Sequence, residues 1–271
     1  MGNIREVDAI AHVLRCFEDE VTHVFNSVDP VRDMEVINLE LCYSDIQILE
    51  KRILKLEKNK KSGNKDSILE YELVQTLMNT LNKGKRIDVN DFDSNQKKII
   101  TSLNLISSKP VIYVLNYGDN QIDNSKIKEL KKTIESEGET FVEIYGLLEN
   151  EIRDLENTEK QMFLSEYNIK KTGLDLLINK AYEYLNLITF YTAGPKECRA
   201  WSIINQSKAP VAAGKIHSDF QKGFIKAEVI KYSDFVNVGS EDEAKKLGYL
   251  KSEGKDYIVE DGDMIHFRYN T

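Results

Sequence analysis

Cysteine is scarce in this sequence of 271 residues, which contains Cys16, Cys42 and Cys198, all far apart. An odd number of isolated cysteines excludes a disulfide scaffold and any CxxC metal site, and it is typical of the reducing cytoplasm. No apolar run approaches the roughly 18 residues that a membrane-spanning helix needs, and the first residues form no basic-then-apolar leader. We therefore expect a cytoplasmic protein without a membrane partner.

Positive charge is also in deficit. The formal net charge is −8, from 37 basic and 45 acidic residues, which argues against a chain that coats nucleic acid by bulk attraction. Residues 186–271 contain 12 basic and 12 acidic residues, so the whole excess of negative charge lies in residues 1–185. The length suffices for about two domains, and the change in charge balance predicts two modules with different partners.

The sequence motifs of several common catalytic centres are absent. None of the 14 glycines begins a GxxxxGK[ST] loop, which holds phosphates with backbone N–H groups and one lysine. The DxxG element, the HExxH zinc motif and the GxSxG nucleophile motif are missing as well. The residues by themselves therefore predict no catalytic centre.

Strand and helix patterns alternate in the first 185 residues, which predicts a parallel α/β sheet. Short buried strands are expected over residues 7–14, 109–116 and 140–145, and amphipathic helices over residues 124–136 and 173–185. Nothing upstream of the first strand supplies a neighbour for it. We therefore expect an exposed sheet edge that pairs with another strand, and self-association with a second copy is one such pairing.

Residues 31–105 are expected to form an α-helical hairpin between the first two strands. A heptad-like apolar seam runs through residues 31–58, and the lysine-rich residues 58–66 predict an exposed turn. The second helix carries four leucines one turn apart, which are Leu69, Leu73, Leu77 and Leu81. Such stripes predict packing of the two helices against each other, and binding of a partner at the tip is the alternative.

The sequence pattern changes in residues 186–271, where short strand-like stretches are bounded by glycine and proline. These strands are expected over residues 188–191, 199–204, 224–230 and 264–269, and they predict a small mixed sheet packed on a helix. Trp201, the one tryptophan, lies on a strand, which favours a core or sheet-face role over stacking on nucleic-acid bases.

Basic residues of this C-terminal part are candidate contacts to RNA phosphates. They are Lys215, His217, Lys222 and Lys226, with Lys231 as a further member of the stripe. A solvated face is the alternative for the lysines, and a structural hydrogen bond is the alternative for the histidine.

One segment carries a pattern of ligand recognition. The strand expected at residues 109–116 ends in Asn116, Tyr117, Gly118 and Asp119. Many P-loop NTPases place an asparagine and a carboxylate three residues apart, just past a strand, to read a purine base at the ligand-binding rim of the sheet. The asparagine holds the loop and the carboxylate accepts from the base edge. A strand-to-helix turn with a cap is the alternative.

Longer stretches closely resemble the YchF/Obg-like ATPases, a family of P-loop NTPases. The N-terminal stretches resemble the segment that follows the switches of this family, at residues 3–19, 23–24 and 28–37. The C-terminal stretches resemble the family's TGS domain almost without interruption, at residues 192–201, 212–228, 254–257 and 261–268. These strings are long and the likeness covers nearly the whole chain, so the resemblance is specific.

The resemblance implies an α/β fold with an incomplete P-loop NTPase sheet, a helical-hairpin insertion and a β-grasp (TGS) domain. The nucleotide-binding domain would comprise residues 1–30 and 106–185, the hairpin residues 31–105 and the TGS domain residues 186–271. The family hydrolyses ATP, often in preference to GTP, with Mg²⁺, and associates with ribosomes. A complete member carries its phosphate loop before the equivalent of Asn3, so we expect this chain to bind no nucleotide tightly by itself and to hydrolyse none.

The base-contacting residues implied by the resemblance are Asn116, Tyr117, Asp119, Tyr145 and Gly146. The family pattern is NxxE, whereas Asp119 is the shorter carboxylate that guanine-specific relatives use. A bulky Tyr145 stands where the base edge would lie, and Glu149 follows it as in the family. The leading function is the C-terminal portion of a YchF-like ATPase or GTPase. The alternative is a non-enzymatic protein that binds RNA or a translation factor through the hairpin and the TGS surface.

Overall fold

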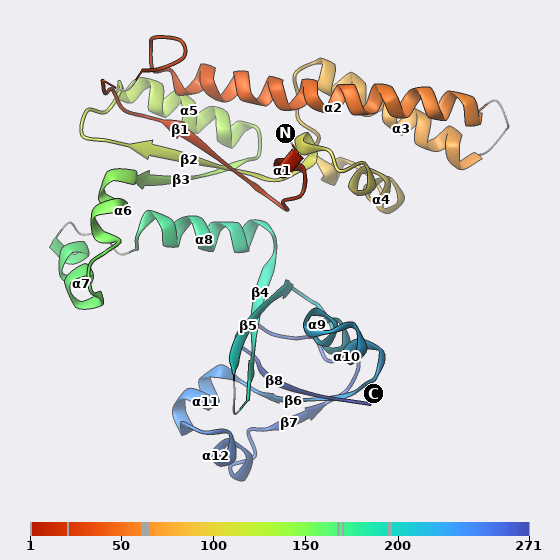
Figure 1. Cartoon of the computed structure of the whole chain (residues 1–271), viewed down its shortest axis with the longest axis vertical. Helices are drawn as coiled ribbons and strands as arrows, with labels where there is room; N and C mark the ends of the chain where they lie inside the picture. The colour runs from red at the N-terminus through yellow and green to blue at the C-terminus, as the bar shows by residue number, and fades with distance from the viewer. Residues whose placement is uncertain are drawn as a thin grey trace. The chain divides into compact units, whose positions relative to one another are not determined.

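A three-stranded parallel sheet lies in the first of two units into which the chain divides, residues 1–181 and 182–271 (Figure 1). The computed structural model describes residues 2–20, 22–60, 65–166, 169, 171–194 and 197–270. The strand order is β1-β2-β3, with the central strand β2 paired on both sides. The strands are β1 (Ile10–Arg15), β2 (Val111–Tyr117) and β3 (Thr140–Tyr145).

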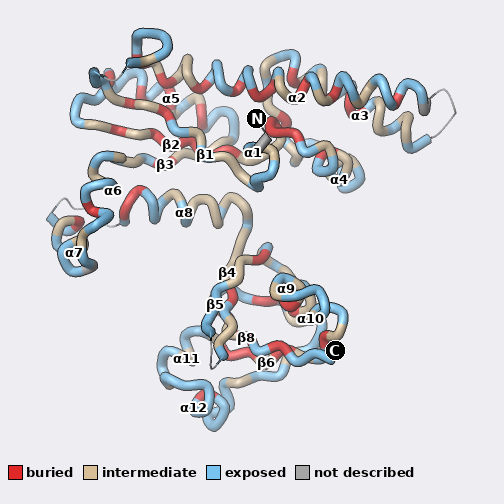
Figure 2. Tube along the Cα trace, in the orientation of Figure 1, coloured by how far each residue is buried: buried red, intermediate tan, exposed pale blue. Residues whose placement is uncertain are grey.

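The central strand is buried because its sequence is a continuous apolar run. Every residue of β2 except Asn116 is buried, which is typical of a parallel strand covered on both faces (Figure 2). The first strand begins at Ile10 rather than at residue 7, because the parallel register starts with Ile10 opposite Val111. A short helix, α1 (Gly2–Arg5), precedes it. The other two strands occur where they are expected, and the parallel sheet is confirmed.

Strand β1 has an open edge. It pairs with β2 on one side, and no other strand of the described residues pairs with its second side. The side chain of Val13 on this strand is 60% exposed. An exposed edge is therefore present in the described part of the chain, as expected, whereas what covers it stays a prediction.

Helix α2 (Pro30–Lys60) joins the sheet to the hairpin as one continuous helix of 31 residues, about 47 Å long. Its N-terminal half packs on the sheet, where Met34 belongs to the same core as Leu14 and Tyr113. The side-chain amide of Asn38 donates a hydrogen bond to the Tyr113 hydroxyl at 2.9 Å, and both residues are buried. The expected boundary at residue 31 thus lies in the first turn of a helix that serves two cores.

The C-terminal half of α2 pairs with α3 (Lys65–Asn82), and α4 (Ser94–Leu103) closes the hairpin core. The apolar seam is buried as the stripes predict, and its members include Leu49, Leu73, Leu77, Leu81 and Ile100. Leu69 is an exception, because its side chain is 63% exposed. It faces a groove between α3 and α4 rather than α2. Residues 61–64 of the expected turn lie outside the described residues.

The short 3₁₀ helices η1 (Val89–Asp91) and η2 (Ile106–Ser108) precede β2. Helix α5 (Asn124–Ser136) follows β2, has the expected bounds and buries Ile127, Leu130 and Ile134 against the sheet. The helices after β3 are α6 (Gly146–Ile152), α7 (Asn157–Glu166) and α8 (Gly173–Tyr184). None of the described helices is long and apolar enough to cross a lipid bilayer.

The second unit is a five-stranded mixed sheet in the order β5-β4-β8-β6-β7, with β4 and β8 parallel and the other pairs antiparallel. The small mixed sheet packed on a helix is therefore confirmed. Its strands are β4 (Leu187–Ala193), β5 (Cys198–Ile204), β6 (Phe224–Ile230), β7 (Lys251–Glu253) and β8 (Met264–Tyr269). Its helices are α9 (Ala209–Ile216), α10 (Ser218–Lys222), α11 (Tyr232–Val238) and α12 (Glu241–Lys246).

The core of the second unit forms where α9 covers one face of this sheet. Phe190, Phe224 and Phe267 fill it together with three buried alanines, Ala209, Ala212 and Ala213, that let α9 approach closely. Trp201 packs at its margin, as expected for a sheet-face residue. Its indole N–H donates to Thr192 Oγ1 at 2.9 Å, and the Arg199 guanidinium lies 4.1 Å from the ring centroid.

Candidate nucleotide-base site

Asn116 joins the end of β2 to the start of α6. Its side-chain Oδ1 accepts a hydrogen bond from the backbone N–H of Gly146 at 3.0 Å. A Cβ atom added to Gly146 would lie 2.9 Å from the same oxygen, which is closer than real Cβ contacts. The carboxamide therefore holds the loop after β3, and a side chain at position 146 would have to displace it.

Glu149 extends this connection to α8. Its carboxylate accepts a hydrogen bond from the backbone N–H of Gly173 at the N-terminus of α8, where a negative charge also interacts favourably with the helix dipole. A Cβ on Gly173 would lie 2.8 Å from Ile144 Cγ1 on β3. Glu149 is thus a structural brace between α6 and α8, a role that its place in the sequence does not reveal.

Tyr117 contributes its side chain to the core rather than to a surface. It is 5% exposed and packs beneath α5, and burial raises the pKa of its phenol, helped by the carboxylate of Glu143. Its ring centroid is 5.4 Å from that of Tyr145, which is 44% exposed. Of the two tyrosines implied in base binding, Tyr145 therefore presents its ring to solvent.

Phe17 lies against the Asn116–Asp119 loop, and the sequence pattern does not single it out. A Cβ on Gly118 would be 2.8 Å from Phe17 Cγ, so the close approach requires glycine. Arg15 fixes this aromatic side chain from the other side, with its guanidinium 4.8 Å from the ring centroid and its Nε donating to Phe17 O at 3.0 Å. The glycine inside the Asn-Tyr-Gly-Asp segment is the signal that points to such a contact.

Asp119 is exposed, and no donor among the described residues binds its carboxylate. The capping role that offers an alternative explanation of this turn belongs to Asp123. Its carboxylate accepts from the backbone N–H of Ser125 at 2.9 Å at the N-terminus of α5, and this hydrogen bond lowers the pKa of Asp123. The structure therefore leaves Asp119 without a structural task at the carboxyl end of β2.

The residues present fit the base end of a purine nucleotide. Asn116 holds the loop, Asp119 is a carboxylate without a donor among the described residues, and Tyr145 exposes an aromatic ring. All lie at the carboxyl ends of the neighbouring parallel strands β2 and β3, which is the edge where α/β sheets bind ligands. The phosphate end is different, because the sequence contains no GxxxxGK[ST] loop. No group of three metal-ligating side chains that suits a cation occurs among the described residues.

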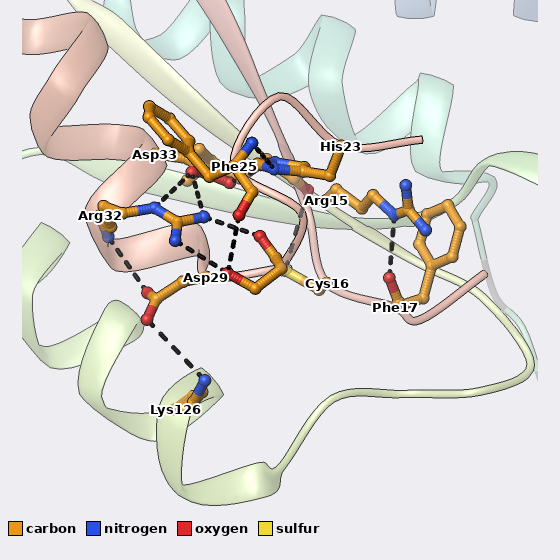
Figure 3. A network of polar contacts seen from close by, with 11 residues as sticks. Arg15, Cys16, Phe17, His23, Phe25, Asp29, Arg32, Asp33 and Lys126 are labelled. Carbon is orange, nitrogen blue, oxygen red and sulfur yellow. Dashed lines mark hydrogen bonds and ion pairs between the residues drawn. The ribbon is translucent and has the colours of Figure 1, made fainter. Parts of the chain in front are cut away.

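A second polar cluster lies at the open edge of β1, in the segment that leads into α2 (Figure 3). His23 Nε2 is 2.9 Å from Asp33 Oδ2, and Arg32 donates to Asp33 Oδ1 at 3.0 Å. The Arg32 guanidinium lies 4.5 Å from the Phe25 ring centroid. Of these residues His23, Phe25 and Asp33 line one side of a hollow of about 540 Å³ whose other wall is β1.

The same hollow contains the partly buried side chain of His12. Burial lowers the pKa of His12 to about 4, with a further contribution from the charge of Arg86, while Asp33 acts in the opposite direction. His12 is therefore neutral at pH 7. Its ring centroid is 5.4 Å from that of Tyr113, so the imidazole packs as part of the sheet face.

The candidate RNA contacts of the second unit lie around α9, α10 and β6, and several have acidic neighbours. His217 Nδ1 accepts from the backbone N–H of Asp219 at 3.2 Å, so the ring caps α10. The Nζ atom of Lys222 lies 3.9 Å from Asp219 Oδ1, and that of Lys226 lies 2.9 Å from Glu228 Oε1. Lys215 is exposed at the end of α9.

Lys231 does not belong to an exposed basic stripe. Its ammonium contacts Asp263 Oδ1 and Glu260 Oε2, each at 2.9 Å, and Asp263 is completely buried. Burial opposes the charge of Lys231, but its hydrogen bonds to Glu260, Tyr257 and Asp263 outweigh that effect and raise its pKa. A buried carboxylate requires a partner charge, and Lys231 supplies it.

Comparison with known proteins agrees with this architecture. The family profile YchF-GTPase_C, described as "Protein of unknown function (DUF933)", matches residues 187–270. The "Ribosome-binding ATPase YchF" of Bacillus subtilis (strain 168) is 41% identical over 276 residues, which cover 100% of this chain and 75% of that relative. The protein of the same name from Haemophilus ducreyi is 41% identical over 273 residues, with the same shares.

A solved structure shows the same fold. "Structure of the Schizosaccharomyces pombe YchF GTPase" matches with a TM-score of 0.84 and 31% sequence identity, over 98% of this chain and 74% of that one. The α/β fold class, with an NTPase sheet followed by a C-terminal domain, is thereby confirmed. The identity is about 40% over the whole chain in several relatives, and the chain belongs to the YchF family.

Proposed function

We propose that this chain supplies base recognition and ribosome docking to a ribosome-associated nucleoside triphosphatase. The family membership and the printed names of the relatives support the coarse function. The hydrogen bonds around Asn116 and Asp119 support the proposed base recognition. Asn116 holds the loop at Gly146 while the nearby Asp119 carboxylate has no donor among the described residues, because Asp123 performs the capping.

Asp119, the shorter carboxylate that guanine-specific relatives use in place of the family's glutamate, favours guanine. The guanine edge presents two adjacent N–H donors to a carboxylate, whereas adenine presents one amino group there. Hydrogen bonds to charged groups contribute about 1.5–3 kcal/mol each, so a missing donor lowers affinity noticeably. We therefore propose GTP over ATP for this chain, with the exposed ring of Tyr145 beside the base.

Hydrolysis in this proposal depends on a phosphate loop, which residues 1–271 do not contain as GxxxxGK[ST]. When bound, Mg²⁺ and such a loop neutralise the charge that develops on the transferred phosphoryl group. The part of this chain is to hold the base through Asp119 and to keep the loop in place through Asn116. A base contact alone offsets little of the entropy lost on binding, which corresponds to millimolar affinity or weaker.

The open edge of β1 supports self-association. A parallel strand with unpaired backbone groups on one side offers a template for another strand, and Val13 exposes an apolar side chain there. We propose that a second copy pairs at this edge when no other strand covers it. Light scattering on the 271-residue chain tests this, with a dimer expected and Val13→Lys shifting it towards monomer. A wild-type monomer at high concentration would contradict the pairing.

For ribosome docking we propose the residues around α9, α10 and β6, with the exposed Lys215, His217 and Lys222 and the partly buried Lys226 as contacts to ribosomal RNA. Support comes from their position on a unit of balanced charge, in contrast to the acidic first unit. Ribosome association makes the cytoplasm the expected location. Binding of RNA or a translation factor without any nucleotide is the alternative that the experiment below distinguishes.

NMR titration of the 271-residue chain tests base recognition directly. We expect GTP at millimolar concentration to shift the amide signals of Gly118 and Gly146, with ATP shifting them less and Asp119→Ala abolishing the response. Asp123→Ser is the matched control, because serine retains the helix cap while the carboxylate is lost. Shifts that survive in Asp119→Ala, or that disappear equally in Asp123→Ser, would remove Asp119 from base recognition.

A further inference from the structure

A groove separates α3 from α4 on the hairpin, away from the Asn116–Asp119 loop in sequence and in fold. It has a volume of about 370 Å³. Its apolar lining consists of Leu69, Leu73, Phe92 and Ile99. Leu69 is 63% exposed although it belongs to the leucine stripe of α3, so part of that stripe is left without a partner in the described chain.

The polar residues of the groove are acidic or neutral. Glu72 and Asp93 bring two carboxylates to it, and the others are Thr76, Asn95 and Gln96. No lysine or arginine lines it within the described part of the chain, and the α4 lysines Lys97 and Lys98 are not among its lining residues. Both carboxylates are exposed, and no cation among the described residues pairs with either. The Asp93 carboxylate also caps α4, because it accepts the backbone N–H groups of Asn95 and Gln96. The groove thus joins an apolar floor to an acidic rim, on which Glu72 is the carboxylate that caps no helix.

We propose that this groove binds a basic amphipathic helix of a partner protein. Helices α3 and α4 and the two residues before α4 form its walls, and a third helix packs well into the channel between two others. A helix satisfies its own backbone hydrogen bonds, whereas an extended peptide would need a sheet edge that α3 and α4 do not offer. Apolar side chains one turn apart would contact Leu69 and Phe92, and flanking lysines or arginines would face Glu72 and Asp93.

The size of the groove matches this occupant. A volume of about 370 Å³ is near the lower end of the roughly 300–1,000 Å³ typical of ligand sites, which accommodates a few apolar side chains but not a folded domain. The negative rim disfavours RNA, because a phosphate backbone would meet carboxylates without a counter-charge. This inference does not rest on nucleotide recognition, since Glu72 and Leu69 lie on the hairpin and Asp119 follows β2.

The chain offers a closely matched control for the experiment. Leu54 and Glu57 on α2 have the same spacing as Leu69 and Glu72 on α3, and neither lines the groove. Leu54 is 62% exposed and Leu69 is 63% exposed. The double variants Leu69→Ser/Glu72→Lys and Leu54→Ser/Glu57→Lys therefore change net charge and exposed apolar surface equally, so bulk attraction affects both alike.

Fluorescence anisotropy with the full 271-residue chain measures binding of a labelled helical peptide of leucine, lysine and alanine, with leucines at i and i+4. We expect saturable binding that weakens about tenfold in Leu69→Ser/Glu72→Lys, because one apolar contact and one charge contact contribute about 1.5 kcal/mol together. The control pair should change affinity by less than about twofold, consistent with exposed positions outside an interface. Thermal unfolding by circular dichroism checks that both variants fold equally.

Two further probes separate the proposed occupant from others. A peptide with a central proline, which cannot form the helix, and a peptide with glutamate in place of lysine should both fail to bind. Absence of saturable binding by the basic helix, equal weakening in both double variants, or undiminished binding of the proline peptide would each overturn the proposal. Competition by a single-stranded oligonucleotide at the groove would also overturn it, because RNA would then be the occupant.

Discussion

The side-chain Oδ1 of Asn116 accepts the backbone N–H of Gly146 at 3.0 Å, and this hydrogen bond joins two loops that are 30 residues apart in sequence. The parallel register brings them together, because Asn116 lies opposite Ile144 and Tyr117 lies opposite Tyr145. The geometry of the candidate site is therefore set by strand pairing and does not require a bound ligand.

Gly146→Ala should destabilise the first unit by about 1–2 kcal/mol, because the new Cβ would lie 2.9 Å from Asn116 Oδ1 and disrupt the hydrogen bond. Urea unfolding measures this change. Gly254→Ala is the control, since a Cβ there meets nothing within 4 Å, and it should change stability by less than about 0.5 kcal/mol. Equal stabilities of the two variants would show that the Asn116 contact is dispensable.

Residues 1–271 should show no GTPase or ATPase activity in a phosphate-release assay, because phosphoryl transfer requires a phosphate loop, its lysine and Mg²⁺. When a segment that carries such a loop is joined upstream of Asn3, turnover should appear. In that fusion Asp119 should favour GTP relative to an Asp119→Glu version. Turnover by the 271-residue chain that disappears in Asp119→Ala would reveal a phosphate site elsewhere in the chain.

Acidification should destabilise the first unit through His12, whose pKa is lowered to about 4 by burial and by Arg86. Between its unfolded value of about 6.5 and the folded value, the unfolded chain binds a proton that the folded chain does not. Stability is therefore fully present above about pH 6.5 and falls as the pH approaches 4. We expect His12 to account for about 1–2 kcal/mol between pH 7 and 5, after allowance for its partial exposure.

The measurement for His12 compares urea unfolding at pH 7 and pH 5 in the wild type and in His12→Gln. Glutamine stays neutral, so the variant should lose less stability on acidification than the wild type. His217→Gln serves as the control, because that imidazole is 60% exposed on the second unit. An identical pH dependence in wild type and His12→Gln would show that His12 does not cause the loss of stability on acidification.

Charge reversal of Lys215, Lys222 and Lys226 should abolish co-sedimentation with ribosomes. Wild-type binding should weaken roughly tenfold or more between 50 and 200 mM salt, because phosphate contacts release counterions. Reversal of Lys245 on α12, also exposed, is the control. Binding that is insensitive to salt and to the three substitutions would place ribosome contact on another surface.

Several elements were predictable because their local sequence contains the whole signal. The apolar run of β2 and the periodic Ile127, Leu130 and Ile134 of α5 mark a buried strand and a one-sided helix. The Asn116-to-Asp119 spacing likewise marks a loop at a strand end. Short helices such as α6 and α9 have no such signal, because their few residues show too little periodicity to distinguish them from loops.

By itself the sequence determined which faces are apolar, where strands end and which family the long strings resemble. Only the tertiary structure decided what covers each face and which partner each polar group meets. Leu69 has the same spacing as its buried neighbours yet remains exposed, and Asp123 rather than Asp119 caps α5. The physical reason is that periodicity reports the hydrophobicity of a surface, whereas its partner is set by strand register and helix packing between residues far apart in the chain.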